Sequence, residues 1–228
     1  MKVPCACASS VQGFHHMAER ISILFDGANF YHLALKPLGI DEIAFDYEAF
    51  ALHLACGRTV SETGKRFYVG TVREKEGDPY TKRAMSLQTK LFTSLSRSGW
   101  EIRTSKLRIR TETIRVDDRM KDFQKIRSIG IAEIEYERTR EKGIDVKLAI
   151  DLMAGAVDDK YDTAIIVSSD SDLTPAMDWV QKRKGKNVEY IGFSVKGAKP
   201  AVSMINYSTS QRIFSESDLQ SFVQKKLV

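Results

Sequence analysis

The chain has 228 residues, of which 43% are hydrophobic and 29% are charged, and this balance predicts one globular domain with a well-buried core. Its formal net charge of +5 is compatible with a polyanionic partner, but many soluble proteins carry as much. The sequence contains no run of about 18 apolar residues, which argues against a membrane-spanning helix and against a membrane partner.

The N-terminal segment, residues 1–16, is predicted to be a flexible extension of a single domain that covers residues 17–228. This extension lacks the apolar core of an export signal. Three cysteines occur, and Cys5 and Cys7 are too close in sequence to form an ordinary disulfide with each other. We therefore expect reduced thiols, including that of Cys56, and a cytoplasmic location.

Short apolar runs alternate with longer segments whose apolar residues recur at helical spacing. The first run ends in Asp26 and Gly27, as expected of a buried parallel strand followed by a tight turn. In chain order, the pattern predicts a strand over 21–25, a helix over 45–55, a strand over 66–72, a helix over 81–97, a strand over 100–110, a helix over 144–159, a strand over 163–167, a helix over 173–184 and a strand over 188–192.

This alternation predicts an α/β fold, in which a doubly wound, mainly parallel sheet is covered by helices on both faces and so forms three α-β-α layers. Residues 163–167 form the most apolar strand, so we expect it near the centre of the sheet. Open parallel sheets bind ligands beyond the carboxyl ends of their strands. Residues that directly follow the predicted strands are therefore candidates for a functional site.

A basic insertion over about residues 103–141 interrupts the alternation. Residues 106–110 and 113–116 alternate basic and apolar side chains around Glu112, which predicts a two-stranded β-ribbon with a turn between them. Such a ribbon could follow a phosphate backbone, protect a solvated sheet edge with charge, or pair with a second ribbon in a homodimer. The residues expected to bind nucleic acid in this segment are Arg103, Lys106, Arg108, Arg110 and Arg115.

Four aspartates are expected at the carboxyl edge of the sheet. Asp26 follows the first strand, Asp170 and Asp172 follow residues 163–167, and Asp145 begins the helix before that strand. Each alone is more simply explained as a turn former or helix cap, and Asp172 is the best capping candidate. Together, carboxylates without basic partners repel one another, so a site that keeps them usually binds a cation such as Mg²⁺.

Several other chemistries are not predicted. His15 and His16 lie in the N-terminal extension, and His32 and His53 lie on helical segments without a second ligand at metal spacing. A P-loop is excluded, because the sequence contains no Gly-x-x-x-x-Gly-Lys-Ser/Thr string. Gly and Ala follow Asp26, so the Asp-x-Asp arrangement of haloacid-dehalogenase-type phosphatases is missing.

Four strings of the sequence resemble, in order, the motifs of one nuclease family. They are Ile-Leu-Phe-Asp-Gly-Ala-Asn at 23–29, Lys-Gly-Ile-Asp-Val at 142–146 with its continuation to 152, Ile-Val-Ser-Ser-Asp-Ser-Asp-Leu at 166–173, and Val-Glu-Tyr-Ile-Gly-Phe at 188–193. The chain is thereby similar to NYN domains, the LabA-like branch of the PIN-like nuclease superfamily, over about residues 20–215. Ser169 and Leu173 stand where Gly and Phe are common, and the basic insertion is longer than expected.

The resemblance implies a PIN-like fold and a site for Mg²⁺ or Mn²⁺. Asp26, Asp145, Asp170 and Asp172 are the implied metal ligands, and Asn29 assists them. The same five residues form the implied catalytic set. A metal held there could polarise a phosphate oxygen and lower the pKa of an attacking water.

Further residues are expected near this site but outside its ligand set. Asp151 matches the family pattern, but it lies about 240° around the predicted helix from Asp145, so one metal could not easily bind both. Ser168 is a candidate to hydrogen-bond a carboxylate. Ser169 and Lys142 are candidates to contact a phosphate of the nucleic acid.

The resemblance further implies a metal-dependent ribonuclease, most simply an endonuclease that hydrolyses RNA phosphodiesters with metal-activated water. DNA is an alternative substrate. Two other functions stay open: a nucleic-acid-binding or regulatory module of the same fold with negligible turnover, and a hydrolase of small phosphate esters. Cleavage assays with and without a chelator distinguish these functions.

Overall fold

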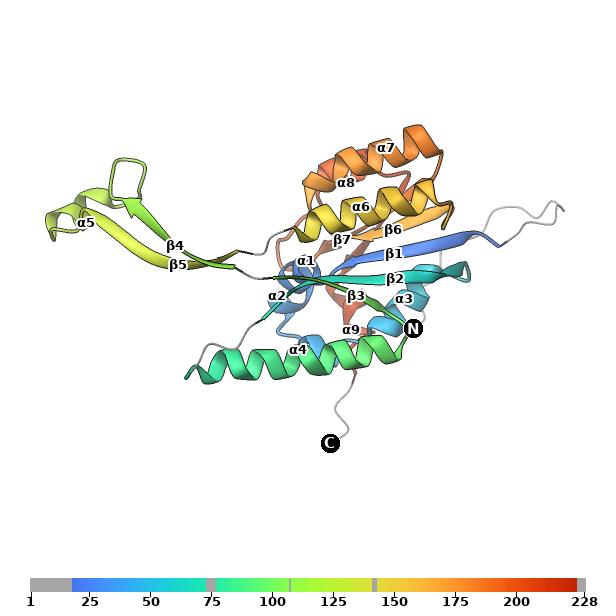
Figure 1. Ribbon diagram of the computed structural model, residues 1–228, viewed down its shortest axis with the longest axis horizontal. Coiled ribbons are helices and arrows are strands. Elements are labelled where there is room, and N and C mark those ends of the chain that lie inside the picture. Colours follow the sequence, from blue (N-terminus) through green and yellow to red (C-terminus); the bar gives the residue numbers. More distant parts are fainter. Residues whose placement is uncertain (1–17, 73–76, 107, 141–142, 225–228) are drawn as a thin grey trace.

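The computed structural model describes residues 18–72, 77–106, 108–140 and 143–224, and it contains one six-stranded sheet (Figure 1). All strands of this sheet run parallel, in the order β3-β2-β1-β6-β7-β8. The strands are β1 (Arg20–Asp26), β2 (Thr59–Thr71), β3 (Glu101–Lys106), β6 (Thr163–Val167), β7 (Asn187–Ser194) and β8 (Ser210–Ser215).

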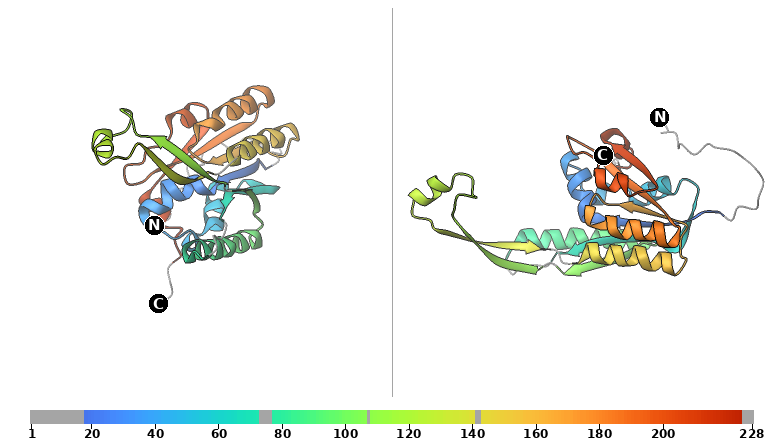
Figure 2. Two further views of the ribbon diagram at one scale, coloured as in Figure 1. Left: turned by 60° about the vertical axis from the view of Figure 1, so that its left-hand side comes forward. Right: turned by 90° about the horizontal axis from the view of Figure 1, so that it is seen from above.

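Helices cover both faces of the sheet (Figures 1 and 2). The first helical segment is continuous, with a π-helical turn between two short α-helices. The helices of the body are α1 (Gly27–Phe30), the π-helical turn (Tyr31–Leu35), α2 (Lys36–Leu38), α3 (Tyr47–Ala55), α4 (Pro79–Arg97), α6 (Ile144–Val157), α7 (Thr174–Lys184), α8 (Val202–Asn206) and α9 (Glu216–Gln220), with 3-10 turns at Glu42–Ala44 and Ser171–Leu173.

The chain builds the sheet in two halves that meet at β1 and β6. It moves outward from β1 through β2 to β3, and then returns to place β6 on the other side of β1, followed by β7 and β8. The predicted α/β fold with three α-β-α layers is confirmed, and β6, which is buried throughout, lies at the centre as expected. The carboxyl ends of β1 and β6 form the switch point of the sheet, where open parallel sheets bind ligands.

Two hydrophobic cores, one on each face, hold the layers together. Alternation along β1 directs Ile23 and Phe25 into the core that α1, α3 and α4 cover, and it directs Leu24 into the core under α6 and α7. The Phe25 ring stacks on Phe67 with 5.4 Å between centroids. Because Asp26 follows Phe25 within β1, the same alternation turns the Asp26 side chain toward the α6 face.

The insertion forms a separate two-stranded antiparallel sheet, which we call the arm. Its strands are β4 (Arg108–Arg115) and β5 (Glu133–Arg140), and α5 (Phe123–Ser128) lies in the connection at its tip. The arm projects away from the body on the side where the parallel strands have their carboxyl ends (Figures 1 and 2). A β-ribbon insertion is therefore present, as predicted.

The predicted pairing inside this ribbon is wrong. Residues 106–110 do not pair with 113–116, because β4 runs straight through Glu112 and pairs with β5 instead. A tight hairpin turn favours Gly, Asn or Asp at positions with positive φ, whereas the two threonines that flank Glu112 favour an extended strand. The predicted strand over 100–110 consequently divides into β3 and β4.

The remaining expectations concern the cysteines, the N-terminal extension, Lys142 and membrane-spanning helices. The expectation of reduced thiols is wrong for Cys56, which is disulfide-bonded, and the other two cysteines lie outside the described residues. The predicted extension over 1–16 and Lys142 also lie outside them. None of the helices in the described part of the chain is long and apolar enough to cross a membrane.

Candidate active site

Asp26 ends β1 and caps the helix that follows it. Its Oδ1 accepts a hydrogen bond from the backbone N–H of Asn29 at 2.9 Å, and the residue is only 4% exposed. Gly27 is required next to it for a steric reason, because a Cβ atom at this position would lie 2.3 Å from Cζ of Phe67. The Asp-Gly pair thus allows α1 to start against the packed aromatic core while Asp26 stays at the strand end.

Two hydrogen bonds connect the end of β1 to the end of β6. Ser168 is fully buried, and its Oγ donates to Oδ2 of Asp26 at 3.0 Å. The backbone N–H of Ser169 donates to Oδ1 of Asn29 at 2.9 Å. The serine pair therefore fixes the orientation of both polar residues of the first motif, and Ser168 occupies the carboxylate-bonding position expected for it.

Asp170 caps the 3-10 turn that follows β6. Its Oδ1 accepts from the backbone N–H of Asp172 at 2.9 Å, while its own backbone N–H donates to Oγ of Ser168 at 3.2 Å. The expectation that Asp172 is the capping residue is wrong, since Asp170 takes that role. Asp172 is left exposed in the first turn.

Asp145 lies in the first turn of α6, which starts after Gly143. Gly143 has a φ of 88°, a left-handed conformation that favours glycine, and this explains the glycine in the second motif. Burial, and after it the negative charges of Asp170 and Asp172, raise the pKa of the Asp145 carboxyl. The carboxylate at the start of α6 and the two carboxylates after β6 therefore repel one another.

A hollow joins the β1 end to the start of α6. It has a volume of about 270 Å³, and polar side chains from both elements line it. The polar lining residues are Asp26, Asn29, His32 and Asp145. The structure thus brings the first and second acidic motifs to one concave surface at the switch point.

The donor types suit a hard divalent cation, because carboxylate and amide oxygens are the groups that Mg²⁺ and Mn²⁺ prefer. Within the described ranges, however, no three His, Cys, Asp or Glu side chains lie close enough together to hold one metal ion. The set of four aspartate ligands therefore stays a prediction. In its favour, the charges of Asp170 and Asp172 act on the carboxylate of Asp145. Burial, and after it these charges, disfavour the charged form of Asp145 and raise its pKa.

Asp151 lies on α6 and belongs to a different cluster, which it forms with residues of β2 and β3. Its Oδ2 accepts from the Tyr68 hydroxyl at 2.9 Å and lies 3.4 Å from Nε of Arg103. Arg103 also pairs with Glu101 at 3.0 Å. Asp151 therefore lies outside the acidic edge, and the guanidinium of Arg103, which was expected to bind nucleic acid, is engaged in ion pairs within the domain.

The other predicted nucleic-acid contacts lie along the base and strands of the arm. Lys106 ends β3, Arg108 begins β4, and Arg110 is exposed on β4. Arg115 pairs with Glu133 of β5 at 3.4 Å. The Ser169 hydroxyl, which was expected to contact phosphate, is bonded to the hydroxyl of Tyr190 at 2.8 Å.

One polar residue of the hollow was missed from the sequence. His32 is exposed and lines the hollow together with Asp26 and Asp145. Its spacing of three positions from Asn29 is the available signal, because such residues share a helix face. The sequence offers His32 no second metal ligand at helical spacing, but a histidine can serve a phosphate site as a proton donor without binding metal.

Comparisons with known proteins agree with this architecture. A family model described as NYN domain matches residues 20–216. Among solved structures, the chain is similar to VPA0982, a Vibrio parahaemolyticus protein of unknown function, with 18% identity and a TM-score of 0.51 over 92% of this chain and 99% of that chain. At this identity the similarity concerns the fold alone. No curated protein matches the chain.

Proposed function

Because the chain belongs to the NYN domain family of the PIN-like nuclease superfamily, we propose that it is an Mg²⁺- or Mn²⁺-dependent endonuclease that hydrolyses RNA. The observation that carries this proposal is the position of Asp26. This carboxylate is buried, doubly hydrogen-bonded and located at the switch point of the sheet, beside the hollow that Asp145 also lines. A structural helix cap alone does not require a second carboxylate there.

In this proposal, Asp26, Asp145, Asp170 and Asp172 would hold the metal, and Asn29 would assist them. When bound, the metal would polarise the scissile phosphate and activate water for attack. Ser168 keeps the Asp26 carboxylate from rotating, through its hydrogen bond of 3.0 Å. Burial, and after it the charges of Asp170 and Asp172, raise the pKa of Asp145, and a bound cation would offset the repulsion among these carboxylates.

The open position of the acidic edge favours a polymeric substrate over a small phosphate ester. The hollow lies on the side from which the arm projects, so a long strand can lie across both (Figure 1). RNA is proposed as the substrate from the family, and DNA of the same sequence is the necessary comparison.

The test is a cleavage assay with labelled RNA and matched DNA, in Mn²⁺, in Mg²⁺ and in EDTA. Asp26→Asn and Asp170→Asn should each lower the rate by more than about 100-fold, beyond the roughly 10- to 100-fold effects of residues that only support metal ligands. Asp178→Asn is the matched control, because Asp178 pairs with Lys182 on α7 at 2.8 Å, away from the hollow. Cleavage that persists in both site variants, or in EDTA, would refute the proposal.

A second function is favoured by the separation of the carboxylates. Since no three candidate ligands in the described ranges lie close enough to hold one metal, the protein would on this alternative bind RNA with negligible turnover. Stoichiometric binding of uncleaved RNA in Mn²⁺ would support it. Turnover of p-nitrophenyl phosphate without RNA cleavage would instead point to a hydrolase of small phosphate esters.

A further inference from the structure

The strand pairing of the arm places four arginines and Glu112 on one face, and three glutamates and Arg115 on the other. β4 and β5 pair with Arg108 opposite Arg140 and Arg110 opposite Arg138. Residues at alternate positions of a strand share a face, so these four positions lie on one side, which we call the arginine face. The remaining positions of β5 form the glutamate face, which carries Glu133, Glu135 and Glu137.

The arginine face is unfavourable for the arm itself. Like charges directly opposite each other destabilise a strand pair. Arg110 is exposed and forms no ion pair with any residue in the described ranges, and Arg138 has one long contact, 3.5 Å from Nη1 to Oε2 of Glu112. A two-stranded ribbon is marginal on its own, and β4 and β5 pack mainly against each other. Folding of the arm therefore does not explain the paired arginines.

The arginine positions lie at the end of the arm that joins the acidic edge. Arg140 is five residues before Asp145, so their Cα atoms are at most about 18 Å apart. The rows at 108/140 and 110/138 are about 7 Å apart along the strands, and the strands are about 5 Å apart. This compact square of arginine positions suits adjacent phosphates, because arginine binds a phosphate with two parallel hydrogen bonds.

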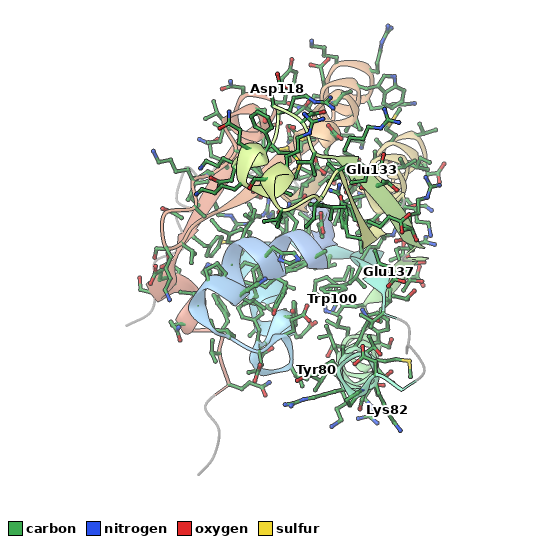
Figure 3. The ribbon with its side chains drawn as sticks, turned by 90° about the vertical axis from the view of Figure 1, so that its left-hand side faces the viewer. Tyr80, Lys82, Trp100, Asp118, Glu133 and Glu137 are labelled. Carbon is green, nitrogen blue, oxygen red and sulfur yellow. The ribbon has the colours of Figure 1, made fainter. Side chains whose placement is uncertain are left out.

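We propose that the arginine face binds the phosphate backbone of the nucleic-acid strand whose neighbouring segment lies at the acidic edge. This inference rests on the proposed function and adds Arg138 and Arg140 of β5 as contacts. Contacts to phosphates carry no base information, so the arm holds a strand without selecting its sequence. The glutamate face repels phosphate and makes the arm one-sided; Figure 3 shows Glu133 and Glu137 along β5.

The test compares two double variants of the full chain in an Asp26→Asn background, so that binding is measured without cleavage. Arg110→Ala with Arg138→Ala removes two arginines, and Glu133→Ala with Glu135→Ala removes two charges from the other face of the same ribbon. The arginine variant should bind a long single-stranded RNA about tenfold more weakly, and its salt slope should fall by about 1.4, since each phosphate contact contributes about 0.7. The glutamate variant should bind at least as tightly as its parent.

Equal RNA affinity of the arginine variant and its parent would refute the inference. An equal loss of RNA affinity in both double variants would also refute it, because it would indicate a damaged arm. Circular dichroism confirms that each variant is folded. With Asp26 restored, the arginine variant should cleave long RNA less efficiently than the wild type does. If wild-type protein cleaves nothing while the binding difference remains, the proposed function fails and the arm inference stands. If cleavage occurs and the arginines have no effect, only the arm inference fails.

Discussion

The hydroxyl of Ser168 donates a hydrogen bond of 3.0 Å to Oδ2 of Asp26, across 142 positions of sequence. Ser168 is fully buried and Asp26 is 4% exposed, so bulk water cannot readily replace this bond. The same hydroxyl accepts from the backbone N–H of Asp170 at 3.2 Å. One small side chain therefore orients an aspartate at the end of β1 and the backbone of an aspartate beyond β6.

Ser168→Ala should weaken both stability and activity. The substitution leaves a buried carboxylate without one donor, which should cost about 1–3 kcal/mol of unfolding free energy. Cleavage should fall by about 10- to 100-fold, the usual effect of a residue that orients a metal ligand. Chemical denaturation and cleavage rates measure the two effects.

Ser208→Ala is the matched control for this prediction. Ser208 donates to the carbonyl of Ile205 at 2.9 Å, within a local turn after α8, so its loss should leave cleavage unchanged. If Ser168→Ala matched the wild type in both measurements, Ser168 would not be the residue that orients Asp26.

Asp145→Asn should stabilise the metal-free protein. A raised pKa means that the folded state disfavours the charged carboxylate, so at neutral pH the charge of Asp145 costs stability. This cost outweighs the attraction of a helix N-terminus for an acidic residue. Because Asp145 is only partly buried, we expect a gain of about 1 kcal/mol or less, which raises Tm by about 2–4 °C at most.

The measurement is a thermal melt in EDTA and in Mn²⁺. Wild-type protein should gain more stability from Mn²⁺ than Asp145→Asn does, since the variant has lost a ligand. If Asp145→Asn melted below the wild type in EDTA, the charge of Asp145 would not cost stability. If Mn²⁺ raised the Tm of both proteins equally, Asp145 would not be a metal ligand.

The parts of the fold that could be predicted are those determined by local patterns. The apolar run before Asp26 has to be buried, and the alternation of such runs with helical segments determines the layers. Strand ends in a parallel sheet then meet at one edge whatever the details of packing. Asp26, Asn29 and Ser168 could be placed on this basis alone.

The features that could not be predicted depend on contacts between distant residues. The partner of β4 begins 18 positions after it ends, so nothing local to Glu112 revealed the true register. Arg103 was expected on the surface, because its partner Asp151 lies on a helix 48 positions away.

His32→Ala should reduce catalysis without reducing metal binding. The exposed imidazole shares the hollow with Asp26 and Asp145, where it can donate a hydrogen bond or a proton to a phosphate oxygen. We expect kcat/KM to fall by about 100-fold, the lower end for proton transfer by a side chain. The increase in Tm caused by Mn²⁺ should be the same as in the wild type.

His53→Ala is the comparison for this histidine. His53 lies on α3, where its ring contacts Phe214 and Phe222 in the core-facing layer, so its loss should not change kcat/KM below the melting temperature. A His32→Ala variant with wild-type kcat/KM would remove His32 from the site. A variant without the Mn²⁺ effect on Tm would show instead that His32 is a metal ligand.

The opposite edge of the sheet should control stability in acid. Oδ1 of Asp162 pairs with Arg20 at 2.8 Å where β1 and β6 begin, and this ion pair lowers the pKa of Asp162 to about 2. A lowered carboxyl pKa contributes stability that is complete above the unfolded value of about 3.9 and is lost as the pH falls toward 2. Asp162→Asn should therefore cost stability at pH 7 and progressively less as the pH falls through this window.

Both groups are well exposed to solvent, so we expect the cost at neutral pH to be about 1 kcal/mol or less. Urea denaturation of wild type and Asp162→Asn over this pH range measures it, and the two free energies of unfolding should converge in acid. Asp158→Asn is the control for the removal of a surface carboxylate, because Asp158 makes an exposed pair of 3.4 Å with Lys160. A difference between wild type and Asp162→Asn that grew in acid would have the wrong sign for a carboxylate stabilised by Arg20. Cleavage at neutral pH should be unaffected, since Asp162 lies at the amino edge and Asp26 at the carboxyl edge of the same sheet.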